Sequence, residues 1–228
     1  ESFKNLLGNG NRLGINIKYA IQDNPNGVAE ALLISQDFIE GKPSLLILGD
    51  NIFYGNSLIK QLTQLSKSNS GATVLASPVS DPERYGIVEL NKQGDILGIE
   101  EKPKNPKSNY ALTGLYYYDE SVIEKALKLK KSPRGELEIT DINKQYLDEN
   151  SLDVVLMGRG TTWLDTGTYD SLHDASCFIK TIQQRQGLII GCPEEVAWRK
   201  GWISDSELEK LLLPLKDNTY RKYLAALL

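Results

Sequence analysis

The sequence predicts an α/β fold: a mostly parallel sheet with helices on both faces, a small β-hairpin region and a helical C-terminal extension. Three observations point to it. Short apolar runs such as 45–48 and 72–76 alternate with stretches of helical periodicity, as in parallel α/β sheets. A hairpin pattern interrupts this alternation in the middle of the chain. After Thr168 the pattern is helical to the end.

The first part of the chain supplies the predicted start of the sheet. Ile15–Ile21 alternates apolar and polar side chains with the period of a half-buried strand. Turn chemistry at 23–27 separates this segment from a helix over 28–39. The apolar run Leu45–Leu48 then predicts a strand that is covered on both faces and ends just before Asp50.

Later elements follow from the same periodicities. The turn 91–94 between two alternating segments predicts a β-hairpin over 86–100. Pro193 before two acidic residues marks a helix start. A Ser-x-x-Glu capping box begins at Ser204, and Asn218 is a candidate cap for the last helix. The other predicted elements are helices at 57–65, 121–129, 139–147 and 169–186 and strands at 72–76, 110–118 and 152–157.

The composition excludes several classes of partner. The 228 residues are 25% charged with a net charge of −4, so the chain has no basic field for nucleic acid. No apolar run is long enough to span a membrane, and no signal segment opens the chain. Two cysteines without metal-site spacing predict free thiols in a reducing cytoplasm. We therefore expect a cytoplasmic globular protein and leave a small anionic substrate open.

Two aspartates stand where a divalent cation would be useful. Asp50 follows a buried strand, at the edge where open α/β sheets bind ligands. Asp165 follows another short apolar stretch and precedes a helix. Carboxylates from two strand ends suit Mg²⁺, which prefers oxygen ligands and bridges phosphates. The alternatives are an Asx turn at Asp50 and an N-cap at Asp165 or Thr168.

Four further residues suit a sugar phosphate. Glu101 is able to accept hydrogen bonds from sugar hydroxyls, and Gly86 allows close backbone approach. Lys102 and Arg134 suit a phosphate, Arg by its planar fork and Lys as a point charge. For each of the two basic residues, the alternative is a solvated surface charge.

Taken together, these segments resemble the glucose-1-phosphate thymidylyltransferase family. The matching stretches follow in order along essentially the whole chain. They are Tyr19-Ala20-Ile21-Gln22 with Gly27, Leu48–Gly55, Asp81–Gly86, Glu100-Glu101-Lys102-Pro103, Ser108–Ala111, Arg134–Asp141, Trp163–Gly167 and Cys192-Pro193-Glu194-Glu195. The resemblance implies a Rossmann-like nucleotidyltransferase core at residues 1–170 and a helical C-terminal extension at 171–228.

The resemblance also implies a reaction, in which dTTP and glucose 1-phosphate give dTDP-glucose and pyrophosphate with Mg²⁺ as cofactor. Asp50 and Asp165 would hold the metal and, with Lys102 and Arg134, would be the catalytic residues. Gln22, Gly27 and Asp50 would bind the nucleotide. The sugar-phosphate site would comprise Asn51, Tyr85, Gly86, Glu101, Lys102, Leu112, Arg134 and Trp163. The product would serve dTDP-rhamnose and polysaccharide biosynthesis, and the protein would be a homotetramer, a dimer of dimers.

One part of the family pattern has no counterpart in this chain. Family members open with a strand and a glycine-rich loop that carries an Arg, followed by a phosphate-contacting Lys. We therefore expect roughly sixty family residues, enough for two βα units, to be missing before the first match. Two alternatives stay open. One is a truncated, catalytically impaired homologue that binds sugar phosphate or acts as an assembly subunit, and the other is uridylyl transfer to glucose 1-phosphate.

Overall fold

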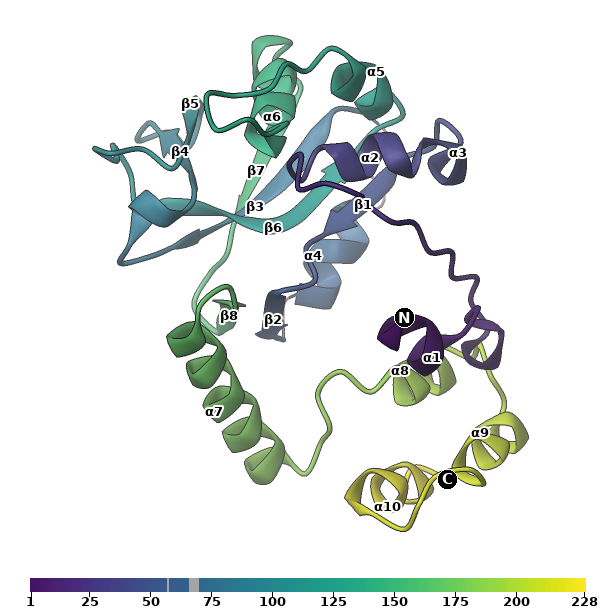
Figure 1. Cartoon of the computed structure of the whole chain (residues 1–228). Coiled ribbons are helices and arrows are strands. Elements are labelled where there is room, and N and C mark those ends of the chain that lie inside the picture. The colour runs from purple at the N-terminus through teal and green to yellow at the C-terminus, as the bar shows by residue number, and fades with distance from the viewer. Residues whose placement is uncertain (57, 66–69) are drawn as a thin grey trace. The chain divides into compact units, whose positions relative to one another are not determined.

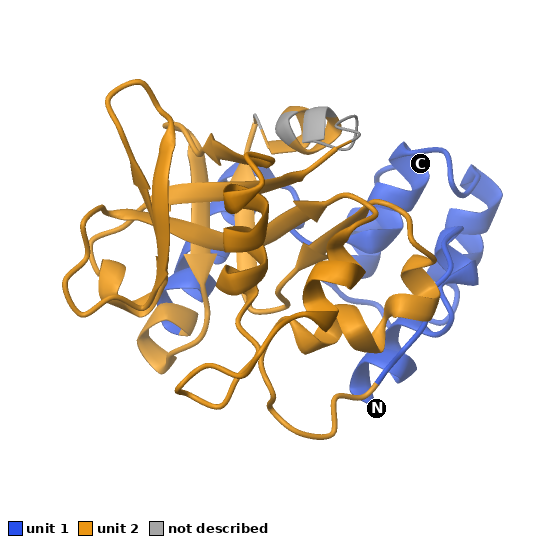
Figure 2. Ribbon diagram, turned by 90° about the horizontal axis from the view of Figure 1, so that it is seen from above, with its two compact units in different colours: residues 1–20, 173–228 blue, residues 21–172 orange. Residues whose placement is uncertain are grey.

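A computed structural model describes residues 1–56, 58–65 and 70–228. They form two compact units (Figure 2). Residues 21–172 make an α/β unit, and residues 1–20 together with 173–228 make a helical unit. The first twenty residues thus belong to the same unit as the C-terminal helices. The division expected from the sequence, at 170/171, placed them in the α/β core instead.

The α/β unit is built on a six-stranded sheet of order β5-β4-β6-β3-β7, with β1 also paired to β6. The strands are β1 (Ser44–Ile47), β3 (Ala72–Pro78), β4 (Gly86–Leu90), β5 (Ile96–Glu101), β6 (Tyr110–Tyr118) and β7 (Leu152–Leu156). The long strand β6 lies between β1 and β3 and is antiparallel to both (Figure 1). Strands β1, β3 and β7 therefore share one direction, since β7 is parallel to β3. The α/β class is confirmed, and the described sheet is mixed because β5 and β6 run opposite to the other strands.

A second, two-stranded sheet pairs β2 (Asn51–Gly55) with β8 (Thr161–Asp165) antiparallel. The strand predicted at 45–48 ends before Asp50, and β2 was not predicted from the sequence. The helices of the α/β unit are α2 (Glu30–Ile34), α3 (Gln36–Ile39), α4 (Leu58–Leu65), α5 (Val122–Leu127) and α6 (Ile139–Asp148), with a 3₁₀ turn at Pro82–Arg84. Residue 57, the predicted first residue of the 57–65 helix, lies outside the described residues.

The core of the α/β unit holds α6 on the sheet. Tyr118 is fully buried and stacks on Tyr116 and on Tyr146 of α6, with ring centroids 6.1 and 5.7 Å apart. The Tyr118 hydroxyl donates to Oδ1 of the buried Asn143 at 2.8 Å. Burial raises the pKa of Tyr118 well above its ordinary value, so the phenol stays a donor. These contacts hold the middle of α6 on the sheet, and the first two residues of this helix, Ile139 and Thr140, line the cavity described below.

The helical unit has its own apolar core. Its elements are α1 (Ser2–Leu7), a 3₁₀ turn at Asn11–Leu13, the part of α7 (Tyr169–Gln186) from His173 on, α8 (Pro193–Arg199), α9 (Asp205–Leu212) and α10 (Thr219–Ala225). Leu13, Leu208 and Leu224 are among its buried side chains. The predicted capping box at Ser204 and cap at Asn218 are confirmed.

Two sequence predictions about the first strands are wrong. Ile15–Ile21 is not a strand: the Ile15 and Ile17 N–H groups bond to the nearby Gly10 and Asn9 carbonyls. Alternation alone does not make a strand, because the backbone also needs a neighbouring strand to pair with. Strand β1 forms as predicted, but Leu45 and Ile47 are half exposed, so one face is not covered.

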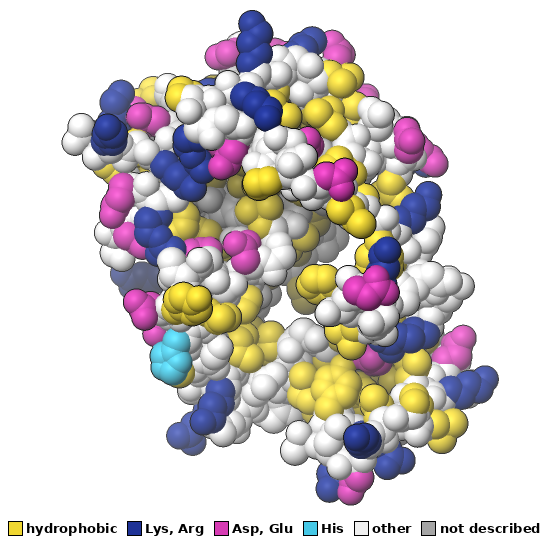
Figure 3. All heavy atoms as spheres, viewed as in Figure 1, with side chains coloured by type: hydrophobic (Ala, Val, Ile, Leu, Met, Phe, Trp, Pro, Cys, Tyr) yellow, Lys and Arg dark blue, Asp and Glu magenta, His cyan; other side chains and the backbone are white. Residues whose placement is uncertain are grey.

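The surface and thiols agree with the composition. On the face seen in Figure 3, basic and acidic side chains are interspersed rather than gathered into a field of one sign. Both cysteines are free, as predicted, Cys177 exposed and Cys192 buried. Within the described residues, we find no helix that has both the length and the apolar character needed to cross a membrane.

Candidate active site

Charged and polar side chains line a cavity of about 490 Å³ in the α/β unit, a size suited to a small ligand. Its lining residues are Val28, Leu48, Asp50, Asn51, Arg84, Tyr85, Gly86, Glu101, Lys102, Leu112, Gly114, Tyr116, Arg134, Glu136, Glu138, Ile139, Thr140, Trp163, Asp165 and Gly167. All the predicted site residues are among them except Gln22 and Gly27. The fold therefore gathers predicted site residues that are up to 115 positions apart, as Asp50 and Asp165 are.

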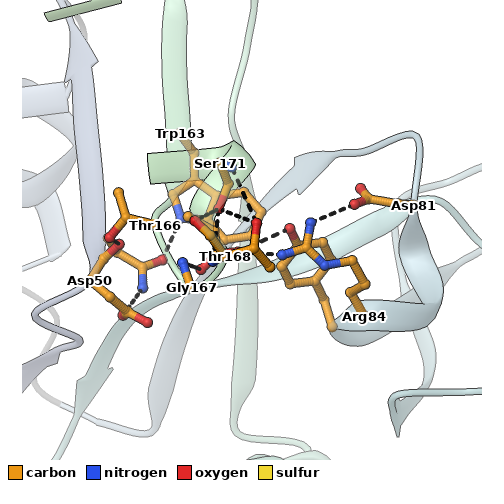
Figure 4. A network of polar contacts seen from close by, with 11 residues as sticks. Asp50, Asp81, Arg84, Trp163, Thr166, Gly167, Thr168 and Ser171 are labelled. Carbon is orange, nitrogen blue, oxygen red and sulfur yellow. Dashed lines mark hydrogen bonds and ion pairs between the residues drawn. The ribbon is translucent and has the colours of Figure 1, made fainter. Parts of the chain in front are cut away.

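The β2/β8 ladder brings the two predicted metal ligands together. Asn51 stands opposite Asp165 in the register of the two strands. One residue further, the N–H and the hydroxyl of Thr166 both donate to the Asp50 carbonyl oxygen, at 2.9 and 2.8 Å (Figure 4). Asp50 is exposed, and its Oδ1 accepts a hydrogen bond from Asn51 Nδ2 at 2.6 Å. Asp50, directly before β2, and Asp165, the last residue of β8, thus both line one cavity.

The Asp165 carboxylate is more enclosed, with 15% of its side chain exposed. Its Oδ2 accepts from Arg84 Nη2 at 2.8 Å and from the Tyr85 hydroxyl at 3.4 Å, and its Oδ1 accepts from the Gly167 N–H at 3.1 Å. Burial, and then the negative charge of Asp165, raises the pKa of Tyr85 to about 12. The Tyr85 phenol is therefore neutral near pH 7 and donates to the carboxylate.

Asn51 connects the ladder to the main sheet. Its Oδ1 accepts from Trp163 Nε1 at 2.5 Å and from the Gly114 N–H at 3.3 Å. A Cβ at Gly114 would lie 2.8 Å from Asn51 Cγ, so only glycine fits without displacing the amide. Trp163 in turn contacts Tyr85 edge to face, with ring centroids 5.1 Å apart. Asn51 therefore fixes the aromatic wall of the cavity.

A second group of charges surrounds Arg134. Its Nη1 lies 3.6 Å from Glu101 Oε1 and 3.5 Å from Glu138 Oε1, and its Nη2 lies 3.3 Å from Glu136 Oε2. The other oxygen of Glu101 accepts from the Thr140 hydroxyl. One guanidinium, 41% exposed, is thus shared among three carboxylates, an arrangement that leaves it able to exchange partners.

Lys102 has an unusual backbone. It adopts a positive φ of 44°, and its N–H donates to the Tyr85 carbonyl at 3.0 Å. A non-glycine residue in this left-handed region is uncommon and costs about 1 kcal/mol or more. The bend directly follows β5 and keeps the lysine among the lining residues.

The two remaining predicted nucleotide residues lie near each other but do not line the cavity. Gln22 Nε2 donates to the Gly27 carbonyl at 3.1 Å and to Glu30 Oε2 at 2.6 Å. Gly27 has a φ of 106°, and an added Cβ would lie 2.4 Å from the Leu137 carbonyl oxygen. The next residue, Val28, is the one from this loop that reaches the cavity.

Sequence reasoning assigned no role to Arg84, Gly114 or Thr140. Arg84 belongs to a stretch that was singled out, and its spacing of three residues from Asp81 is a signal for the ion pair that forms. Thr140 and Gly114 gave no signal, because their partners Glu101 and Asn51 are 39 and 63 positions away.

Comparisons with known sequences show which family this chain belongs to. The nucleotidyl transferase family matches residues 1–182. The chain is 54% identical over 225 residues to a protein of Xanthomonas campestris pv. campestris named glucose-1-phosphate thymidylyltransferase, covering 99% of this chain and 76% of that protein. Proteins of the same name match from Neisseria meningitidis, at 51% over 227 residues and 100% and 79% of the two chains, and from Mycobacterium tuberculosis, at 50% over 226 residues and 99% and 78%.

Two solved structures show where the fold recurs. A Bacillus anthracis protein assigned as a glucose-1-phosphate thymidylyltransferase, crystallised with sucrose, superimposes with a TM-score of 0.72 and 38% identity over 84% of this chain and 74% of its own. A UDP-glucose pyrophosphorylase in complex with UDP-glucose gives a TM-score of 0.64 at 23% identity, over 72% and 66% of the two chains. The second likeness bears on the fold alone.

Proposed function

The chain belongs to the nucleotidyl transferase family, and from that premise we propose that it is a glucose-1-phosphate thymidylyltransferase. It converts dTTP and glucose 1-phosphate into dTDP-glucose and pyrophosphate. The observation that carries the proposal is the match, over essentially the whole chain, to relatives that bear this name. That match favours thymidylyl transfer over the two alternatives, a non-catalytic homologue and a uridylyltransferase.

The reaction depends mainly on the positioning of the two substrates and on neutralisation of their negative charge. A phosphate oxygen of glucose 1-phosphate attacks the α-phosphorus of dTTP, the bond from that phosphorus to the bridging oxygen breaks, and pyrophosphate leaves with the electron pair. Such transfers need reactants held in line and negative charge neutralised. The cavity offers both kinds of group, carboxylates for a cation and the side chains of Lys102 and Arg134 for phosphate oxygens.

Asp50 and Asp165 are the proposed ligands of Mg²⁺. Their carboxylates are hard oxygen donors, Asp50 directly before β2 and Asp165 at the end of β8, and both residues line the cavity. Among residues 1–56, 58–65 and 70–228, no group of three Asp, Glu, His or Cys side chains forms a metal site. Water and substrate phosphates would complete the coordination, as is usual for Mg²⁺. When bound, the ion supplies positive charge that neutralises the phosphates in the transition state.

The sugar-phosphate part of the site lies around Glu101. Its carboxylate, oriented by Thr140, accepts hydrogen bonds from glucose hydroxyls, and Gly86 lets the sugar approach the backbone. Lys102 and Arg134 bind the sugar phosphate, for which Arg134 exchanges part of its carboxylate contacts. Asn51, Tyr85, Leu112 and Trp163 complete this part of the wall. Gln22 and Gly27 bind the thymine base beside Val28.

The wider setting follows from the family. The protein works in the cytoplasm, where its product serves dTDP-rhamnose and polysaccharide biosynthesis. It assembles as a homotetramer, a dimer of dimers. The name of the relatives supports only dTDP-glucose as the product, and the rest of this setting is proposed from the family resemblance.

The test is a pyrophosphate-release assay on the full chain with Mg²⁺, glucose 1-phosphate and either dTTP or UTP. We expect turnover only when both substrates are present, and faster turnover with dTTP than with UTP. A preference for UTP would support the uridylyltransferase. No turnover, together with binding of glucose 1-phosphate in a calorimetric titration, would support the non-catalytic homologue.

A further inference from the structure

Arg84 lies between two carboxylates at the cavity. Its Nη1 donates to Asp81 Oδ2 at 2.7 Å and its Nη2 to Asp165 Oδ2 at 2.8 Å. Figure 4 shows the arginine with Asp81 on one side and the turn at Gly167 on the other. Its guanidinium also lies 5.1 Å from the centroid of the Tyr85 ring. Arg84 thus has two partners of the same chemistry, only one of which, Asp165, is a proposed metal ligand.

A metal ion bound to Asp165 would lie close to the positively charged guanidinium of Arg84. Mg²⁺ binds a carboxylate oxygen at about 2.1 Å, and Arg84 Nη2 is 2.8 Å from Asp165 Oδ2. An ion on that oxygen would therefore lie within about 5 Å of the arginine, where like charges repel strongly in a partly buried site. The Asp165 side chain is only 15% exposed, so water screens the repulsion weakly. The ion and the arginine compete for one carboxylate.

We propose that Arg84 is the counter-ion of Asp165 in the metal-free protein and moves onto Asp81 alone when a divalent cation binds. The inference rests on the proposed function, because it takes Asp50 and Asp165 as the metal ligands. Asp81 is suited to this part because it already holds Arg84 and is more exposed than Asp165, at 38%. Arg84 is therefore a positioning residue. The free energy needed to break its ion pair with Asp165 lowers the affinity of the site for the metal.

The proposal predicts opposite effects for the two partners. Mn²⁺ is titrated into the full chain without nucleotide, and free Mn²⁺ is followed by electron paramagnetic resonance. Arg84→Gln should bind Mn²⁺ roughly three- to tenfold more tightly, because Asp165 loses its counter-ion. Asp81→Asn should bind it more weakly by a similar factor, because Arg84 then stays on Asp165. The double variant should match Arg84→Gln, because Asp81 acts through Arg84.

Two controls separate this effect from general charge. Arg84→Lys keeps the positive charge and should stay closer to wild type than Arg84→Gln. Arg159→Gln removes an exposed positive charge elsewhere in the α/β unit and should leave Mn²⁺ affinity unchanged. Circular dichroism of every variant checks that the fold is kept.

Several results would overturn the proposal. If Arg84 merely braces Asp165, Arg84→Gln weakens Mn²⁺ binding. The proposal is also contradicted if wild type and both single variants bind Mn²⁺ with equal affinity, or if none of the proteins binds Mn²⁺. The turnover assay keeps the two claims apart: thymidylyl transfer by a protein whose Mn²⁺ affinity does not depend on Arg84 removes this inference and leaves the proposed function standing.

Discussion

The two units of the chain use charged side chains in different ways. In the α/β unit, charges at the cavity share partners: Arg84 is divided between Asp81 and Asp165, and Arg134 lies among three carboxylates. In the helical unit, each of two carboxylates has a single basic partner and a tyrosine hydroxyl as a second donor. Glu194 is held by Arg12 at 2.9 Å and by the Tyr220 hydroxyl at 2.5 Å.

Glu195 repeats the pattern of the helical unit. Its carboxylate accepts from Arg199 at 2.7 Å and from the Tyr223 hydroxyl at 2.5 Å. Closed pairs of this kind stabilise a fold, because each buried charge already has its partners. Shared partners at a cavity can be exchanged for a ligand. The difference indicates that the α/β unit carries the chemistry and that the charges of the helical unit serve its stability.

Replacing Asp165 by Asn should have the largest effect. The variant loses one proposed metal ligand, so kcat/KM for thymidylyl transfer should fall by at least about a hundredfold. The assay is pyrophosphate release. Asp153→Asn, an exposed carboxylate on β7, is the matched control and should keep its activity. Wild-type activity in Asp165→Asn would mean that the charges at this cavity do not carry the reaction.

Gly114→Ala tests how tightly the site is packed. The new Cβ would lie 2.8 Å from Asn51 Cγ, so the amide that holds Trp163 has to shift. Overpacking of this kind costs up to about 3 kcal/mol in unfolding free energy. Gly98→Ala is the control, because an added Cβ there has no neighbour within 4 Å. Denaturant unfolding compares the two, and equal stability would show that Asn51 is not held by its contact with Gly114.

Tyr220→Phe tests a closed pair of the helical unit. Burial raises the pKa of Glu194, but hydrogen bonds from Tyr220 and Arg12 outweigh it and hold the pKa below the ordinary value of 4.5. This stabilisation is present above pH 4.5 and is lost as the pH falls through the folded pKa. The variant should lose about 1.5 kcal/mol near pH 7, and the difference from wild type should shrink below pH 4.5. Urea unfolding across pH measures it, and a difference that does not change with pH would contradict the pairing.

Ser204→Ala should have the smallest effect. It removes the side chain that caps α9 by accepting from the Glu207 N–H, which costs about 1 kcal/mol. Ser204→Asp retains a capping acceptor and should restore most of the loss. Thermal unfolding distinguishes them, and identical losses in both variants would show that capping is not the cause. Activity should not change in either, since Ser204 belongs to the helical unit.

Local elements were predictable where side chains report burial or a cap. The strand predicted at 110–118 has the bounds Tyr110–Tyr118, and the capping box at Ser204 forms as expected. The strand expected at Ile15–Ile21 fails and β2 was missed, because strands depend on a partner that periodicity does not reveal. The antiparallel orientation of β6 between β1 and β3 was not predictable for the same reason, because it depends on which strands pair.

The candidate site shows the same division. Asp50 and Asp165 were recognised because each follows an apolar stretch within a family motif, and the pairing of β2 with β8 brings the two residues to one cavity. The sharing of Arg84 between Asp81 and Asp165 was not predictable, because Arg84 and Asp165 are 81 positions apart in the sequence. Local spacing reveals which residues carry charge, whereas the fold decides which charges share a partner.

We propose that Asp50 and Asp165 together hold one divalent cation for the transfer. Anomalous scattering from a crystal of the full chain grown with Mn²⁺ and dTDP-glucose tests it most directly. We expect one Mn²⁺ with an oxygen of each carboxylate at about 2.1 Å, and Arg84 on Asp81 alone. A nucleotide bound in the cavity with Mn²⁺ contacting neither aspartate would contradict it.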